Sequence, residues 1–164
     1  MSDKRRWRSG EDVAIVEAAL FATRTPVAIL PEGQDTFAAP SRVVLAWNQS
    51  AESLAAIRAG LPILQNAASV NIAIIDPPTH DLDRSDPGGL LAELLTRHGV
   101  HCDISVLAKT MPRISDVLLR HIQDQNAEMI VMGAYGHSRF REAILGGATR
   151  NMLEDSPIPI FMAH

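Results

Sequence analysis

Short apolar runs alternate along the chain with longer segments of helical period. The first run, 43–47, has no polar residue among its apolar ones, which is typical of a strand buried on both faces. Further strands are predicted at 70–75, 101–107, 130–132 and 158–162. Because helical segments separate these strands, the pattern predicts an α/β fold, a doubly wound five-stranded parallel sheet with helices on both faces.

The segments between the strands have the spacing of amphipathic helices. Ser50 is a favourable N-cap for a helix that continues to about Asn66, and Pro62 is expected to kink or split this helix. The apolar faces of the next two helices comprise Leu90, Leu91, Leu94 and Leu95, and then Ile114, Val117, Leu118, His121 and Ile122. A last helix is predicted at 147–154.

Residues 11–30 show an additional helix and strand before the first strand of the sheet. Shifted by 131 positions, this segment matches the end of the chain, with Pro26 on Pro157 and Ile29 on Ile160. We interpret it as the last helix and strand of a preceding, incomplete repeat, with a chance match as the alternative. The strand at 27–30 is then expected to lie antiparallel to a final strand, of its own chain or of a partner, because that apolar edge would otherwise stay unpaired.

The repeat divides the chain into four parts. Residues 1–10 form a basic tail that is expected to be flexible, 11–30 the additional helix and strand, 31–40 a linker, and 41–164 one complete domain. The tail carries four basic side chains and one acidic side chain, so the rest of the chain accounts for more than the whole net charge of -4. An acidic domain argues against nucleic acid as a partner.

Composition indicates a folded domain outside the membrane. The chain is 46% hydrophobic and 21% charged, and its apolar runs are far shorter than the roughly 20 residues of a membrane span. The first ten residues lack the apolar core of a secretory signal, and the chain has a single cysteine. We therefore expect a cytoplasmic protein.

A glycine-rich stretch at 133–149 is the most informative motif. It follows a predicted strand, leads into a helix and contains Gly133, Gly136, Gly146 and Gly147. Glycines let backbone amides approach a ligand, and a helix N-terminus favours an anion, so this is the expected place for a phosphate. The alternative is structural: Gly133 and Gly136 turn the chain, and Gly146–Gly147 pack closely against a neighbouring segment.

The spacing Gly133-x2-Gly136-x9-Gly146 and the ending Ser156-Pro157-Ile158-Pro159-Ile160 resemble the universal stress proteins. The resemblance implies their Rossmann-like five-stranded fold and a role in stress response. In nucleotide-binding members this motif holds the ribose and phosphates of ATP. By this comparison Ala148 and Thr149 also match, but Gly147 stands where those members have serine or threonine.

The same resemblance places the nucleoside near the end of the first strand. ATP-binding members carry aspartate there, whereas this chain has Asn48, and Trp47 before it could stack on adenine or fill the adenine pocket. Ile74 is the matching apolar neighbour of adenine, or a core residue. The implied cofactor is ATP with Mg²⁺. The candidate nucleotide-binding residues are Ala46, Trp47, Asn48, Ile74, Gly133, Gly136, His137, Arg139, Gly146, Gly147, Ala148 and Thr149.

The sequence carries no recognisable catalytic motif. It has no Gly-x-Ser-x-Gly elbow, no Gly-x4-Gly-Lys-[Ser/Thr] loop and no His-Glu-x-x-His pair, so we expect no enzyme activity. Cys102 is interpreted as an inert thiol on an inner strand, His98 and His101 as surface residues, and His121 as a satisfied, semi-buried histidine.

Two function classes remain. The first is a stress-response domain that holds an adenine nucleotide, and the second is a protein-interaction or dimerisation module of the same fold. A homodimer is expected through the final strand, Ile158 to Met162, through the strand at 27–30, or through both.

Overall fold

The computed structural model describes residues 10–77, 86–134 and 147–164. They form one six-stranded sheet in the order β1-β6-β5-β2-β3-β4. Strands β2 to β6 run parallel to one another, and β1 pairs antiparallel with β6. This confirms the predicted α/β fold with an additional N-terminal strand. The strands are β1 (Val27–Ile29), β2 (Arg42–Ala46), β3 (Ser69–Ile75), β4 (Cys102–Leu107), β5 (Met129–Gly133) and β6 (Ile160–Ala163).

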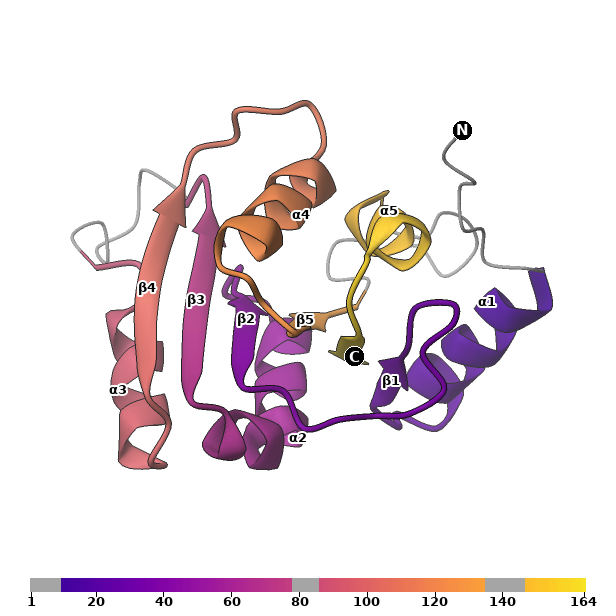
Figure 1. Ribbon diagram of the computed structural model, residues 1–164, viewed down its shortest axis with the longest axis horizontal. Coiled ribbons are helices and arrows are strands. Elements are labelled where there is room, and N and C mark those ends of the chain that lie inside the picture. Colours follow the sequence, from indigo (N-terminus) through magenta and orange to yellow (C-terminus); the bar gives the residue numbers. More distant parts are fainter. Residues whose placement is uncertain (1–9, 78–85, 135–146) are drawn as a thin grey trace.

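Helices cover both faces of the sheet (Figure 1). They are α1 (Gly10–Glu17), which continues into the π-helical turn η1 (Ala18–Ala22), α2 (Ala51–Asn66), α3 (Gly89–Arg97), α4 (Ile114–Asp124) and α5 (Gly147–Asp155). One core lies under α2 and α3, and the other lies under α4, α5 and the N-terminal helix. In the described ranges no helix combines the length and the apolar character needed to cross a bilayer.

Helix α2 is not split at Pro62, so of the two expected effects, a kink or a split, the split does not occur. It runs as a single helix from Ala51 to Asn66 with the proline inside it. Proline removes the amide that would bond to the carbonyl of Arg58. Because both Pro62 and Arg58 are exposed, water can bond to that carbonyl instead, and the helix continues.

The sequence prediction was wrong about the place of Cys102. It lies on β4, which forms an edge of the sheet rather than an inner strand, and the thiol is half-buried beside the carbonyl of Ala92. The predicted apolar face of α3 is also only partly buried. Leu91 and Leu95 enter the core, whereas Leu90 and Leu94 are exposed.

The N-terminal segment completes the opposite edge of the sheet. β1 pairs with β6 of its own chain, with Val27 opposite Met162 and Ile29 opposite Ile160, so the predicted antiparallel pairing is present within the chain. Leu20 in η1 is fully buried in the core beneath α5. β6 thus has a neighbour on each side, and a homodimer through β6 would require β1 to leave its own sheet.

Candidate functional site

The carboxyl ends of β2 and β5 meet at the point where the strand order reverses. From β2 the chain proceeds to β3 and β4 on one side, and later to β5 and β6 on the other. Ligands of doubly wound sheets bind in the crevice outside such a reversal point. Ala46 lies opposite Met132 in the register, so the residues that follow, Trp47 and Gly133, adjoin the reversal point.

Gly133 is required by close packing against the start of α2. A Cβ at this position would lie 2.6 Å from the carbonyl carbon of Glu52 and still closer to the backbone nitrogen of Ser53. Real Cβ atoms do not approach backbone atoms so closely. Gly133 therefore lets the first turn of α2 lie against the end of β5, and its φ is not in the left-handed region that a chain-reversing glycine adopts.

Gly147, in contrast, lies in open surroundings. It is exposed at the start of α5, and a Cβ built on it meets no atom of the described residues within 4 Å. The alternative that Gly146–Gly147 pack closely against a neighbouring segment thus finds no partner for Gly147 among the described residues, and Gly146 lies outside them.

Hydrogen bonds fix the loop between β2 and α2. Ser50 caps α2, because its Oγ accepts a hydrogen bond from the backbone amide of Ser53 at 3.1 Å. The Oδ1 of Asn48 accepts from the amide of Ser50 at 3.2 Å, and Gln49 between them adopts a φ of 60°. The exposed Asn48 thus uses its carbonyl oxygen within the loop and presents an amide donor where an aspartate would present a second acceptor.

The two helix starts near this crevice differ in charge. Glu52 lies in the first turn of α2, where its carboxylate offsets the positive end of the helix dipole. The first turn of α5 contains no acidic residue, and Arg150 pairs with Glu154 at 2.8 Å one turn along the helix. Of the two, the start of α5 is therefore the better place for an anion.

The remaining candidate nucleotide-binding residues differ in how deeply they are buried. Ile74 is 3% exposed and belongs to the core under α2 and α3, and Trp47 is half-buried against that same core. Ala46 packs partly against the opposite core, Ala148 is half-buried and Thr149 is buried. Gly136, His137, Arg139 and Gly146 lie outside the described residues.

No metal centre accompanies these residues in the parts of the chain that the structure describes. No three or more His, Cys, Asp or Glu side chains gather there in a way that could hold an ion. His98 and His101 are both exposed, as predicted.

Comparison with known proteins gives the family. The sequence profile described as "Universal stress protein family" matches residues 40–164, about three quarters of the chain. The chain belongs to the universal stress protein family. This confirms the resemblance noted in the glycine motif and in the final strand.

Individual relatives are distant. Universal stress protein Slr1230 of Synechocystis sp. is 22% identical over 157 residues, which cover 94% of this chain and 52% of that protein. A universal stress protein structure from Archaeoglobus fulgidus superimposes with a TM-score of 0.65 at 18% identity, covering 85% of this chain and 50% of that one. The chain thus spans about half the length of these two relatives.

A third similar structure holds a nucleotide. It is described as a universal stress protein in complex with cAMP, and it matches with a TM-score of 0.61 and 21% identity over 77% of this chain and 98% of that chain. Identities this low establish a shared fold and leave the ligand of this chain open.

The sequence predicted a satisfied His121 but not its partners in this universal stress protein. His121 on α4 is buried, and its Nε2 donates a hydrogen bond to Oδ1 of Asn71 on β3 at 2.7 Å. The amide nitrogen of Asn71 donates in turn to Asp103 and, at 2.9 Å, to Oγ of Ser105 on β4. One buried asparagine therefore ties α4 to the edge strand.

Burial gives this network a pH dependence. Loss of hydration lowers the pKa of His121 below its ordinary 6.5, although Asp124 and Asp103 oppose the shift. On acidification the unfolded chain takes up the proton first, so the free energy of unfolding should fall as the pH decreases below 6.5.

Urea denaturation at a series of pH values measures this effect. His121→Gln should remove the part of the slope due to this residue. Equal slopes for wild type and His121→Gln would contradict the assignment.

Proposed function

We propose that this universal stress protein acts in stress response by holding an adenine nucleotide, ATP, at the carboxyl ends of β2 and β5. The observation that carries the proposal is the reversal of strand order there, with the acid-free start of α5 following the glycine-rich segment. A relative of the same fold is described in complex with cAMP, which is also an adenine nucleotide.

The geometry suggests how the ligand would lie. The phosphates would approach the start of α5, where Gly147 has no side chain and the helix dipole attracts an anion. The amide of Asn48 would donate to an acceptor on the nucleoside, since its Oδ1 already accepts from Ser50. Mg²⁺ would accompany the phosphates. Nothing in this arrangement requires a catalytic base, so we propose holding rather than turnover.

Position 147 offers a graded test, because a Cβ there meets no described residue within 4 Å. Gly147→Ser adds the hydroxyl that nucleotide-binding members carry, and a hydrogen bond to a charged phosphate is worth about 1.5–3 kcal/mol. We expect Gly147→Ser to bind ATP with Mg²⁺ roughly tenfold more tightly than its matched control Gly147→Ala. Gly147→Asp should weaken binding through repulsion between like charges.

Isothermal titration calorimetry of these variants with ATP and Mg²⁺ measures the order of affinities. Absence of heat at millimolar ligand in the wild type and in Gly147→Ser would contradict nucleotide binding. Equal affinities for serine, alanine and aspartate at position 147 would mean that the phosphates lie elsewhere.

A protein-interaction or dimerisation module of the same fold is the second candidate. The observation that favours it is that Trp47 and Ile74, the two residues expected beside adenine, both pack against the core under α2 and α3. A nucleotide base would then have less apolar surface to contact. Failure of the calorimetric titration would leave this second candidate in place.

We further propose that the N-terminal segment is the last helix and strand of a preceding copy in a tandem arrangement. In the register, Ile29 lies opposite Ile160, the residue onto which the shift of 131 positions places it. An antiparallel strand pair in which one residue lies opposite its own equivalent has the local two-fold symmetry of two like domains that meet at their last strands. The matched relatives, about twice as long as this chain, support the proposal.

A further inference from the structure

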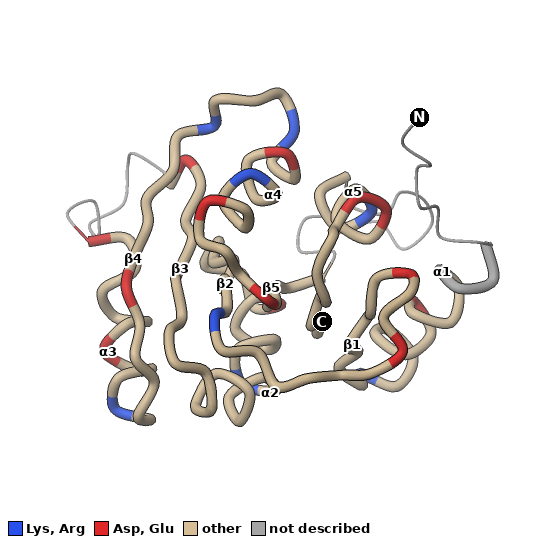
Figure 2. The backbone as a smooth tube through the Cα atoms, in the orientation of Figure 1, with Lys and Arg blue, Asp and Glu red and all other residues tan. Residues whose placement is uncertain are grey.

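A side chain just beyond β6 holds the end of β5. Nδ1 of His164 lies 2.9 Å from the carbonyl oxygen of Ala134, and because that oxygen can only accept, the imidazole donates the hydrogen bond. The amide of Ala134 bonds to the carbonyl of Ala163 at 2.9 Å. Ala134 is fully buried, so its carbonyl needs a partner within the protein, which His164 supplies. Residues 129–134 and 160–164 include no Lys, Arg, Asp or Glu, so no charged side chain of these two segments competes for this bond (Figure 2).

The same imidazole packs against the N-terminal segment. The rings of Phe21 and His164 meet edge to face, with their centroids 4.6 Å apart and an interplanar angle of 71°, which is a favourable arrangement for an aromatic pair. Phe21 lies in η1, in which the amide of Thr23 bonds to the carbonyl of Ala18, five residues back. Such π-helical turns occur frequently at functional sites. In η1 the neighbouring Leu20 is buried in the core, while Phe21 contacts His164.

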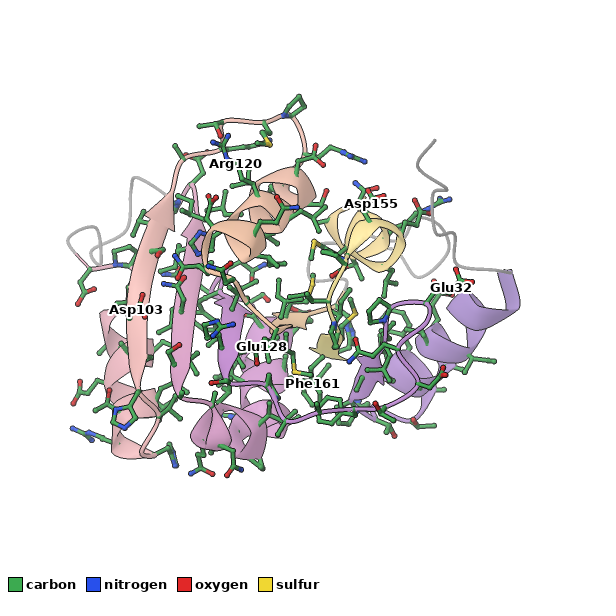
Figure 3. All side chains as sticks on the ribbon, viewed as in Figure 1. Glu32, Asp103, Arg120, Glu128, Asp155 and Phe161 are labelled. Carbon is green, nitrogen blue, oxygen red and sulfur yellow. The ribbon has the colours of Figure 1, made fainter. Side chains whose placement is uncertain are left out.

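The alternation of side chains along β6 explains why these two rings meet. Phe161, labelled in Figure 3, and Ala163 belong to the core under α2 and α3. Met162 belongs to the other core, under α4, α5 and the N-terminal helix. Because side chains alternate between the two faces of a strand, His164 follows Met162 to the side on which the N-terminal helix packs. Phe21 comes from that helix.

We propose that His164 is a positioning residue for the nucleotide site and that Phe21 holds it in place, which rests on the proposed function. Ala134 directly follows Gly133, in the glycine-rich stretch whose backbone amides would bind the phosphates. Because a peptide bond is planar, a carbonyl held in place also fixes the direction of the amide on the same bond. The hydrogen bond from His164 therefore preorganises the start of this stretch for a ligand. The N-terminal segment thus influences ligand affinity without touching the ligand.

Matched substitutions at position 164 separate the hydrogen bond from the packing. The side-chain amide nitrogen of asparagine is bonded to Cγ, as Nδ1 of histidine is, and can donate to the carbonyl of Ala134, whereas leucine has a similar shape without a donor. We expect His164→Asn to bind ATP with Mg²⁺ nearly as tightly as wild type, and His164→Leu to bind roughly tenfold more weakly. Isothermal titration calorimetry of the full chain measures these affinities, and thermal melting of each variant serves as the folding control.

Phe21→Leu tests whether the aromatic contact acts through His164. Loss of the aromatic pair should weaken ATP binding about fivefold in the wild-type background. In the His164→Leu background the same substitution should have no further effect, because the imidazole that Phe21 holds is already absent. Amide hydrogen exchange without nucleotide adds a readout that does not depend on the ligand. The amide of Ala134, at the end of the β5–β6 pairing, should exchange faster in His164→Leu than in His164→Asn.

Three affinity results would overturn the proposal and leave the proposed function standing, because ATP still binds in each. The first is equal affinity of wild type and His164→Leu, the second a His164→Asn variant as weak as His164→Leu, and the third a Phe21→Leu effect of the same size in both backgrounds. Unchanged exchange of the Ala134 amide in His164→Leu would equally refute it. Absence of heat in every protein, wild type included, would instead refute the proposed function, and the positioning role with it.

Discussion

Gly133→Ala is expected to lower the free energy of unfolding by about 3 kcal/mol, the upper end of the usual cost of overpacking. The added methyl group would lie 2.6 Å from the backbone carbon of Glu52 and closer still to the amide nitrogen of Ser53. These are backbone atoms in the first turn of α2, and the turn is held by the Ser50 cap, so no flexible side chain can move aside. Either β5 or α2 must shift. Urea denaturation monitored by circular dichroism measures the loss.

Gly147→Ala is the matched control within the same glycine-rich stretch. Its methyl group meets no atom within 4 Å in the described part of the chain, and alanine favours a helix over glycine by up to about 1 kcal/mol. We expect unchanged or slightly increased stability. Equal destabilisation of both variants would show that close packing at α2 is not what requires glycine at position 133.

Gly133 and Gly147 show how much of the structure could be predicted from the spacing of the glycine motif. The spacing predicted a strand, a glycine-rich segment and a helix, and β5 and α5 occur as expected. The spacing could not separate the roles of the individual glycines. Gly133 is explained by a contact with α2, about eighty residues earlier in the chain, and no local pattern carries that information.

The order of strands was beyond local reasoning for the same reason. Runs of apolar residues predicted each strand to within a few residues, but whether a strand is central or at an edge depends on pairing between distant segments. Cys102 was therefore assigned to an inner strand and lies on the edge strand β4. The polar residues Asp103 and Ser105, which alternate with apolar ones, were the available signal for a half-exposed strand.

The candidate site was predictable in outline only. Asn48, Trp47 and Gly133 do lie at the carboxyl ends of β2 and β5, where the resemblance placed them. The engagement of Asn48 with Ser50 and the packing of Trp47 against the core are tertiary facts. They leave the side-chain amide of Asn48 as a donor and reduce the apolar surface of Trp47 that a ligand could contact.

The N-terminal segment combines a strand pairing and a packing contribution that mutations can separate. β1 covers the edge of β6, while Leu20 fills the core beneath α5. Leu20→Ala should remove the packing alone, at a cost of about 2–5 kcal/mol, and leave the β6 edge covered. Ile15→Ala, at a position 67% exposed, is the matched control and should change stability by less than about 0.5 kcal/mol.

Deletion of residues 1–31 should remove both contributions, lowering the melting temperature by roughly 10 °C and increasing the particle mass. The mass should rise because the deletion uncovers the outer edge of the apolar strand β6, whose residues are all buried in the full chain. Light scattering and thermal melting of the deletion variant, beside Leu20→Ala, measure the two effects. A lower melting temperature without a change of mass would show that β1 contributes packing but does not protect an edge. Unchanged mass and unchanged melting temperature would contradict the proposed role of the segment altogether, including its place as the last strand of a preceding copy.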